Sequence, residues 1–366
     1  MNHSLELVKK IKQALISGRI MVQDVPIDDL KKCVYLELQT KKMTYTETQF
    51  DAVTNSYNEF CNMVYDGEDD RTKVILFLTG LEMCLHTVSD SVLSLANRDY
   101  WTSIHANRLP DSEIEEIIDF VDEKKQIRLL PYDFVESYLE RECPVYHDDD
   151  CDMDYVMHDG KRMYFPRRMD AKGIADYYNV ILAEQDARSP HCYGKDGYSI
   201  KEGDILVDAG GAEGFFTLDN IELISKAYVF DADKEWIEAL EKTFEPFGER
   251  VEIRYGYVGD ISDDDNNITL DNELDGIEVN YIKMDIEGYE KGALKGAQRI
   301  INGSQNLRCA ICSYHCKEDE AWITDFFKRN GMETAHSHGY MCPDWINDGL
   351  LKAELRRGVV FGRKIN

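Results

Sequence analysis

The chain has 366 residues, of which 43% are hydrophobic and 11% aromatic, enough for about two globular domains with separate cores. Its 42 basic and 70 acidic residues give a formal charge of −28, which argues against partners such as a nucleic-acid backbone or an anionic membrane surface. Ten cysteines spread over this length favour reduced thiols over a disulfide framework.

Polar residues interrupt every apolar run in residues 1–20, so this segment predicts neither a signal peptide nor a membrane-spanning helix. The longest apolar stretch, residues 74–88, contains Glu82 and His86 and is too short to cross a bilayer. We therefore expect a cytoplasmic protein without a membrane span.

The first third of the chain has the periodicity of helices. In residues 46–67 the apolar side chains recur at helical spacing, and Gly67 follows as a stop signal. Similar patterns occupy residues 5–17, 28–38, 70–96 and 111–123. We predict a helical N-terminal domain over residues 1–140.

The next segment, residues 141–195, is predicted to be a connector. The acidic run at 147–154 lacks the glycine and the terminal glutamate of a hand-type calcium loop, which favours a solvated linker. Asp159-Gly160 lies between two short alternating runs at 154–165, which predicts a β-hairpin. Residues 171–186 return to helical spacing.

Residues 196–366 alternate short apolar strands with helices, which indicates a Rossmann-like α/β domain with a mostly parallel sheet. The last strand is predicted to run in reverse. Predicted strands are 204–209, 227–231, 251–255, 280–285, 309–313, 332–336 and 358–363, and predicted helices are 213–224, 234–244, 290–302 and 318–330. Ligands of such sheets bind at the carboxyl ends of the strands.

A glycine-rich loop follows the first of these strands, in "ILVDAGGAEGFFTL". Gly210, Gly211 and Gly214 allow tight turning and close approach of a ligand to the backbone, next to a helix N-terminus. A dinucleotide loop needs G-x-G-x-x-G, and this chain has Ala209 at the first of those positions. The match to a dinucleotide loop is therefore imperfect.

Acidic residues favour a cationic ligand in this loop. Asp208 and Glu213 would repel a pyrophosphate, whereas they suit the sulfonium and ammonium of S-adenosylmethionine. Asp231, 23 residues beyond Asp208, ends the next strand and can accept hydrogen bonds from ribose hydroxyls in either cofactor class. A helix cap is the alternative interpretation of Asp231.

Two carboxylates follow the fourth predicted strand. Asp285 ends it, Glu287 comes next, and Gly288 lets the chain turn into a helix. These carboxylates can orient the methionine ammonium, position an acceptor hydroxyl or hold a divalent metal, or they can merely cap the helix. His315, just past the fifth strand, is a candidate general base, and His191 can close over the cofactor. The alternative for each histidine is a packed structural role.

The segments "VDAGGAEGFFTL", "VFDAD" and "IKMDIEGYEKGALKGA" resemble those of FkbM-type S-adenosylmethionine-dependent methyltransferases. The resemblance extends to "EQDARSPHCY" and "ICSYHCKEDEAWI" and covers roughly residues 171–366. It implies a seven-stranded methyltransferase sheet, S-adenosylmethionine as cofactor, and O-methylation of sugars and small natural products.

The resemblance also implies roles for particular residues. Its loop motif puts Asp208, Gly210 and Gly214 at the methionine end of the cofactor, with Gly211 and Glu213 in the same loop. It puts Asp231 on the ribose, and Asp285 with Glu287 beside the reacting centre. Members commonly have Glu-Pro after the second strand, where this chain has Asp231-Ala232-Asp233, so Asp233 is a second candidate for the ribose. Gly259 and Asp260 are the candidates for the adenine.

No metal site is predicted. His336 and His338 have a spacing compatible with metal binding but no visible third ligand, and Cys309, Cys312 and Cys316 are better explained as packed thiols than as a metal cluster.

The function predicted from the sequence is an O-methyltransferase acting on a small-molecule or glycan acceptor that bears a sugar. Two alternatives remain open. One is an NAD-dependent oxidoreductase that uses the glycine loop, and the other is a catalytically silent protein that binds a cofactor or a partner.

Overall fold

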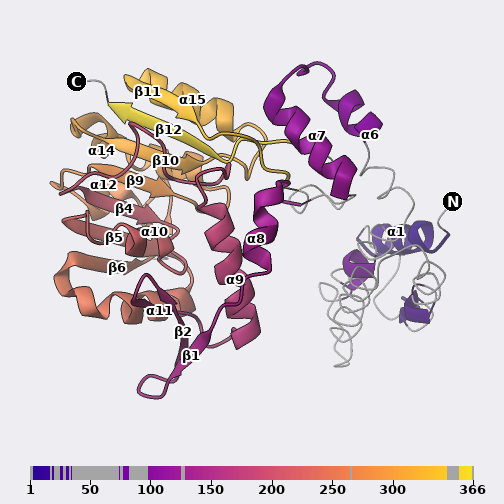
Figure 1. Cartoon of the computed structure of the whole chain (residues 1–366), viewed down its shortest axis with the longest axis horizontal. Coiled ribbons are helices and arrows are strands. Elements are labelled where there is room, and N and C mark those ends of the chain that lie inside the picture. Colours follow the sequence, from indigo (N-terminus) through magenta and orange to yellow (C-terminus); the bar gives the residue numbers. More distant parts are fainter. Residues whose placement is uncertain are drawn as a thin grey trace. The chain divides into compact units, whose positions relative to one another are not determined.

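The computed structural model describes residues 3–16, 19, 25–27, 30–32, 34, 74, 77–81, 98–124, 128–263, 266–343 and 354–364. The chain divides into two compact units (Figure 1). The first comprises residues 1–109, 121–127 and 344–353, and the second comprises 110–120, 128–343 and 354–366. The domain boundaries predicted from the sequence stay predictions.

The described residues of the first unit include α1 (His3–Ile16) and α6 (Arg98–Ile104), and α7 (Ser112–Lys124) spans the division between the units. The buried side chains of the first unit include Val8, Phe77, Leu81 and Trp101. The predicted helices at 5–17 and 111–123 are confirmed, whereas 46–67 lies outside the described residues, as do most of 28–38 and 70–96. Within the described part of the chain, no helix combines the length and apolar character needed to cross a bilayer.

The second unit begins its β structure with a three-stranded antiparallel sheet, β1-β2-β3. Its strands are β1 (Val145–Asp148), β2 (Met153–His158) and β3 (Lys161–Tyr164), preceded by the short helices η3 (Asp133–Val135) and α8 (Glu136–Leu139) and followed by α9 (Ala171–Glu184). Asp159 and Gly160 both have positive φ, as the predicted hairpin turn requires. Asp170 caps α9 by accepting the N–H of Gly173.

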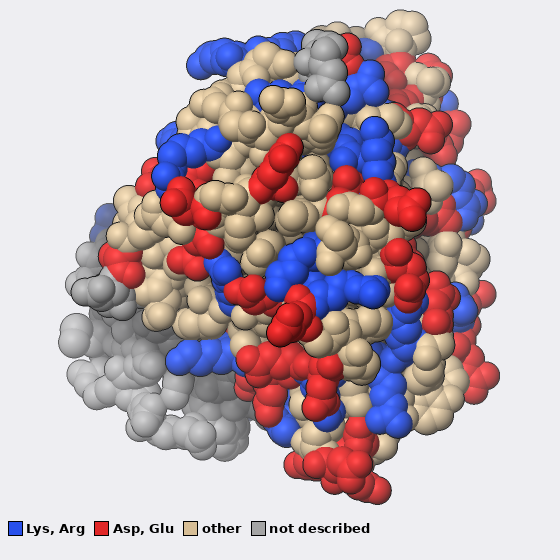
Figure 2. Space-filling view, turned by 90° about the vertical axis from the view of Figure 1, so that its left-hand side faces the viewer, with Lys and Arg blue, Asp and Glu red and all other residues tan. Residues whose placement is uncertain are grey.

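The prediction of a linker at residues 147–154 is wrong. Both ends of this acidic run belong to strands, because His147 pairs with Asp154 and Asp148 with Met153 across β1 and β2. Asp148 accepts hydrogen bonds from Arg162 and Tyr164 of β3, so cross-strand partners hold an acidic segment in the sheet. Acidic side chains gather at the bottom of Figure 2, where the β1–β2 hairpin ends.

The main sheet has seven strands in the order β11-β12-β10-β9-β4-β5-β6. Five neighbouring strands are parallel, whereas β12 runs antiparallel between β10 and β11, which confirms the predicted reversed last strand. The strands are β4 (Ile205–Ala209), β5 (Lys226–Asp231), β6 (Val251–Tyr255), β9 (Tyr281–Met284), β10 (Arg308–Cys312), β11 (Met332–His336) and β12 (Val359–Lys364). A separate parallel pair is formed by β7 (Tyr257–Val258) and β8 (Asn267–Ile268).

Helices cover this sheet and complete its core. They are α10 (Phe215–Asp219), α11 (Lys234–Phe244), η4 (Glu245–Arg250), α12 (Leu270–Glu273), α13 (Glu290–Lys295), α14 (Gln298–Gly303) and α15 (Asp319–Arg329). Leu270, Leu294, Ile301 and Phe327 from four of these helices share one buried cluster with residues of the central strands. The helix predicted at 213–224 is only α10, and the one predicted at 290–302 is interrupted between α13 and α14.

Substitution of Phe230 tests the packing of the core of the main sheet. Phe230 lies in β5 with none of its surface exposed, so Phe230→Ala should lower the free energy of unfolding by about 3–5 kcal/mol through lost burial and a residual cavity. Leu223, which is 44% exposed, is the control, and Leu223→Ala should change the value by no more than about 0.5 kcal/mol. Urea unfolding followed by circular dichroism measures both, and equal losses would contradict this packing.

Candidate functional site

The carboxyl ends of three neighbouring parallel strands carry the predicted acidic residues. In the sheet, β4 lies between β5 and β9. Asp208 is the second-last residue of β4, Asp231 is the last residue of β5, and Asp285 directly follows β9. Because parallel strands end at one edge of a sheet, the fold brings these three residues to the same edge, as predicted.

The glycine loop packs against protein at each of its three glycines. A Cβ on Gly210, which has a φ of 79°, would lie 1.7 Å from the carbonyl oxygen of Asp285. A Cβ on Gly211 would meet Val229 at 2.3 Å, and one on Gly214 would meet Phe244 at 2.7 Å. Packing against neighbouring segments and α11 therefore also requires glycine at these positions, in addition to the tight turning and ligand approach that were predicted.

Asp208 is fully buried and has partners within the protein. Its Oδ2 accepts a hydrogen bond from the Thr217 hydroxyl at 2.7 Å, and its Oδ1 lies 3.0 Å from Nζ of Lys283. Nζ of Lys283 also donates to the Gly210 carbonyl at 2.6 Å. Burial would lower the pKa of Lys283, but the contact with Asp208 and the charges of Asp208 and Asp285 together outweigh it and raise this pKa. Asp208 thus anchors β9 and the glycine loop to β4, and its predicted contact with a cofactor stays a prediction.

Asp231 holds the backbone on both sides of the site. Its Oδ2 accepts the N–H of Ala212 in the glycine loop, and its Oδ1 accepts the N–H of Asp233, each at 2.8 Å. Burial raises the pKa of Asp231. The side chain is half-buried, and a carboxylate oxygen has two lone pairs, so each oxygen can accept one more hydrogen bond from a ligand hydroxyl. Asp233 instead caps α11 through the N–H of Glu235 and pairs with Arg168.

Glu213 lies beside aromatic side chains of α9 and α11. The Tyr177 hydroxyl donates a hydrogen bond to Oε2 of Glu213 at 3.1 Å, and the Tyr177 ring packs against Trp236 of α11 with ring centroids 5.7 Å apart. Burial raises the pKa of Glu213 from 4.5 to about 7. The position of α9 could not be predicted from local spacing, because Tyr177 lies 36 residues before Glu213.

Asp285 is the centre of a polar cluster. Its Oδ2 accepts a hydrogen bond from the Tyr193 hydroxyl at 2.8 Å and lies 3.3 Å from Nε2 of His191, and its Oδ1 lies 3.5 Å from Nε2 of His315. Burial would raise the pKa of Asp285, but the contact with His191 and the charges of His191, Lys283 and His315 together outweigh it and hold this pKa well below its usual value. The structure thus joins the two predicted histidines through one carboxylate.

His315 lies between carboxylates and is 4% exposed. Its Nδ1 is 3.0 Å from Oε1 of Glu290, and its Nε2 is 3.6 Å from Oε2 of the exposed Glu287. Burial lowers the pKa of His315, but the contact with Glu290 and the charge of Asp285 outweigh it, so the pKa is raised above 6.5. These carboxylates stabilise an imidazolium, which is the state of a base that has accepted a proton.

Glu290 is a site residue that the sequence analysis missed. It has no exposed surface, and its Oε1 accepts the N–H of Ile286 at 3.0 Å and that of Gly288 at 3.4 Å. Glu290 therefore fixes the turn that carries Glu287, which has a positive φ of 55°. The signal for Glu290 is that it is the third acid of "DIEGYE", after Asp285 and Glu287.

His191 has a second set of neighbours. Its Nδ1 lies 3.7 Å from Oε2 of Glu184, the last residue of α9, and its Nε2 lies 3.6 Å from Sγ of Cys312. Burial lowers the pKa of His191, but the charge of Glu184 and the contact with Asp285 outweigh it and raise this pKa. Burial also raises the pKa of the Cys312 thiol. Glu184 and Tyr193 are the first and last residues of "EQDARSPHCY", but neither was predicted as a site residue.

The remaining predicted residues have various other contacts. The half-buried Gly259 donates its N–H to the carbonyl of Ile268, and Asp260 beside it is exposed. His336 ends β11, where its Nε2 lies 3.1 Å from the Thr324 hydroxyl. Cys309 and Cys312 are buried in β10, and the half-buried Cys316 follows it. All three are free thiols, and their interpretation as packed side chains stays a prediction.

A cavity of about 270 Å³ opens at the opposite edge of the sheet, where the parallel strands begin. Lys201, Arg308, Arg363 and Lys364 line it together with Glu333 and neutral residues. Its guanidinium groups are already paired, Arg308 with Asp204 at 2.7 Å and Arg363 with Glu333 at 2.6 Å. Figure 2 shows basic and acidic side chains interspersed over this face. Because these two guanidinium groups are already paired, we place the candidate site at the carboxyl edge and not in this cavity.

Residues 225–331 match the family model described as methyltransferase FkbM domain. No curated protein matches the chain. Over residues 225–331 the match confirms the resemblance named from the sequence motifs. This segment includes β5, β9, β10 and α15, which carry or flank Asp231, Asp285 and His315.

Several solved structures are similar to parts of the chain. Methyltransferase FkbM from Methylobacillus flagellatus KT is 18% identical over 54% of this chain and 56% of its own, with a TM-score of 0.35. Precorrin-6y C5,15-methyltransferase from Geobacter metallireducens GS-15 is 7% identical over 55% of this chain and 93% of its own, with a TM-score of 0.34. An rRNA methylase from Streptococcus thermophilus is 15% identical over 46% of this chain and 90% of its own, with a TM-score of 0.33. At these values the fold assignment rests on the strand order of the sheet itself.

Glu213 predicts a pH-dependent loss of stability. Its folded pKa of about 7 exceeds the ordinary value of 4.5, so the folded state binds this proton more tightly than the unfolded state. The free energy of unfolding should therefore fall as pH rises between these values, and Glu213→Gln should remove roughly 1–3 kcal/mol of that fall.

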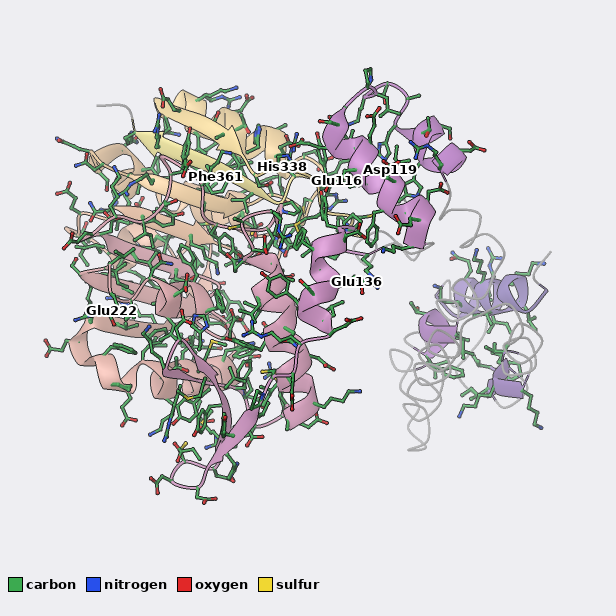
Figure 3. The ribbon with its side chains drawn as sticks, viewed as in Figure 1. Glu116, Asp119, Glu136, Glu222, His338 and Phe361 are labelled. Atoms are coloured by element: carbon green, nitrogen blue, oxygen red, sulfur yellow. The ribbon has the colours of Figure 1, made fainter. Side chains whose placement is uncertain are left out.

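Urea unfolding across this pH range is the measurement. The control is Glu222→Gln, an exposed carboxyl that Figure 3 labels at the end of the sheet away from α9, and it should keep the whole decline. An unchanged decline in Glu213→Gln would refute the buried environment of Glu213.

Proposed function

Because the chain carries a methyltransferase FkbM domain over residues 225–331, we propose that it is an S-adenosylmethionine-dependent O-methyltransferase. Its acceptor is a hydroxyl of a sugar, of a sugar-bearing metabolite or of a glycan. The family match supports methyl transfer over the oxidoreductase alternative, and the acceptor class rests on the resemblance of the motifs to that family.

The observation that carries this proposal is the acidic character of the carboxyl edge. Asp231, Asp285, Glu213 and Glu287 converge there, and the nearby Lys283 is already paired with Asp208. A pyrophosphate would meet unfavourable charge in this environment, whereas a ligand with a sulfonium and an ammonium is attracted.

The residues present fit S-adenosylmethionine. Oδ1 of Asp285 is buried and accepts no hydrogen bond from the described residues, so an ammonium can satisfy it. Asp231 is the candidate for the ribose, and the loop from Gly210 to Gly214 is the candidate for the methionine end. When bound, this cofactor supplies a methyl group on a positively charged sulfur.

The protein contributes alignment and removal of a proton. Holding an acceptor hydroxyl in line with the methyl group can supply about 7–11 kcal/mol of the barrier reduction. His315 accepts the hydroxyl proton at Nε2, and the imidazolium that forms is stabilised by Asp285 on one side and by Glu290 at Nδ1 on the other. Glu287, which is exposed at the rim, is the candidate for orienting the acceptor.

Cofactor identity is tested by calorimetric titration of the whole protein. S-adenosylmethionine and S-adenosylhomocysteine should bind with micromolar affinity, and NAD should not bind. Asp231→Ala should abolish the binding of both adenosyl ligands, because it removes the acceptor for the ribose hydroxyls.

The matched control is Asp233→Ala, two residues further on, which should keep binding because Asp233 caps α11 and pairs with Arg168. Binding of NAD alone would overturn the assignment. Loss of binding in Asp233→Ala but not in Asp231→Ala would show that Asp233, and not Asp231, binds the ribose.

The proposed base is tested by His315→Gln. This change should lower kcat by about 10²–10⁴-fold and leave the binding of S-adenosylhomocysteine intact. In the wild type the rate should rise with pH through the pKa of His315, which lies above 6.5, because only the neutral imidazole accepts a proton. Rates are measured as release of S-adenosylhomocysteine with monosaccharides, nucleotide sugars and glycans as acceptors.

His336→Gln is the control for this test, because His336 ends β11 beside Thr324, outside the cluster around Asp285. It should retain the wild-type rate. A His315→Gln variant with unchanged kcat and an unchanged pH profile would remove His315 from the mechanism.

A further inference from the structure

A second histidine–carboxylate cluster shares no residue with the cluster around Asp285. His158 ends β2, Asp159 begins the hairpin turn after it, and Asp219 ends α10. One ligand atom from each of these residues can be chosen so that all three lie within 4.8 Å of one another. None of the three has a part in the proposed methyl transfer.

The imidazole of His158 is buried and oriented. It is 4% exposed, it packs on the ring of Phe215 with centroids 4.5 Å apart, and its Nδ1 lies 3.1 Å from the Tyr178 hydroxyl. With Nδ1 donating to that oxygen, Nε2 carries a free lone pair. This arrangement is typical of a histidine that ligates a metal through Nε2.

Nε2 of His158 has no hydrogen bond among the described residues, although it is buried. It points to Asp219, whose Oδ1 lies 3.5 Å away. Two ligands that each lie about 2.1 Å from a tetrahedral ion are separated by about 3.4 Å, so this distance suits a shared metal. The side chain of Asp219 is half exposed, and Asp159 is exposed, so an ion can enter from solvent.

We propose that His158, Asp159 and Asp219 form a site for a divalent transition metal such as Zn²⁺. One imidazole with two carboxylates is a ligand set that zinc accepts, and water completes the coordination. The ion offsets the two carboxylate charges. It also joins the β2–β3 hairpin to α10, the helix that begins directly after Gly214 of the glycine loop.

The test is calorimetric titration of the 366-residue protein with ZnCl₂ after dialysis against a chelator. The wild type should bind Zn²⁺, and Asp219→Asn and His158→Ala should each weaken that site by about tenfold or more. Asp219→Asn changes a half-exposed side chain, so its result stands even where the buried His158→Ala variant fails to fold.

Two further variants distinguish this site from other carboxylates. His147→Ala removes an exposed histidine that already contacts Asp154 at 2.7 Å on the neighbouring strand, and it should leave zinc affinity unchanged. Asp285→Asn removes the centre of the methyl-transfer cluster and should also leave this site intact. Zinc binding that survives Asp219→Asn, or that is lost only in Asp285→Asn, would overturn the proposal. Failure of cofactor binding would leave this result untouched, because the zinc titration contains no cofactor.

Discussion

A buried ion pair between Lys283 and Asp208 holds together the edge of the sheet on which the candidate site lies. Nζ of Lys283 reaches the carboxylate of β4 and the carbonyl of Gly210, so a single cation connects β9, β4 and the glycine loop. Removing one partner of such a pair leaves a buried charge without compensation, at a cost of about 3–5 kcal/mol. Asp285 directly follows β9, the strand that carries Lys283, so its position depends on this ion pair.

The strands could be predicted closely, because buried parallel strands are short apolar runs bounded by glycine and acidic residues. The helix after the glycine loop was overestimated, since Asp219 and Asn220 end it after one turn although the apolar pattern continues. The acidic run at 147–154 was mistaken for a linker, because its partners Arg162 and Tyr164 lie on a strand beyond the next turn. Pairing of this kind leaves no periodic signal.

The acids at the strand ends could also be predicted, because topology alone brings the ends of parallel strands together. What could not be predicted is which side chains complete the cluster. Tyr193 reaches Asp285 across 92 residues, and His191 reaches Cys312 across 121. Such contacts depend on how the segment before the sheet folds over its edge. Local spacing carries no information about that path.

The proposed methyl transfer to a hydroxyl oxygen can be followed with an isotope label. The 366-residue protein is incubated with S-adenosylmethionine labelled in its methyl group and with sugar acceptors, and the labelled product is identified by mass spectrometry and NMR. We expect the label in a methyl ether on a sugar hydroxyl. Label on nitrogen or carbon, or NAD-dependent oxidation of the acceptors without transfer of label, would contradict it.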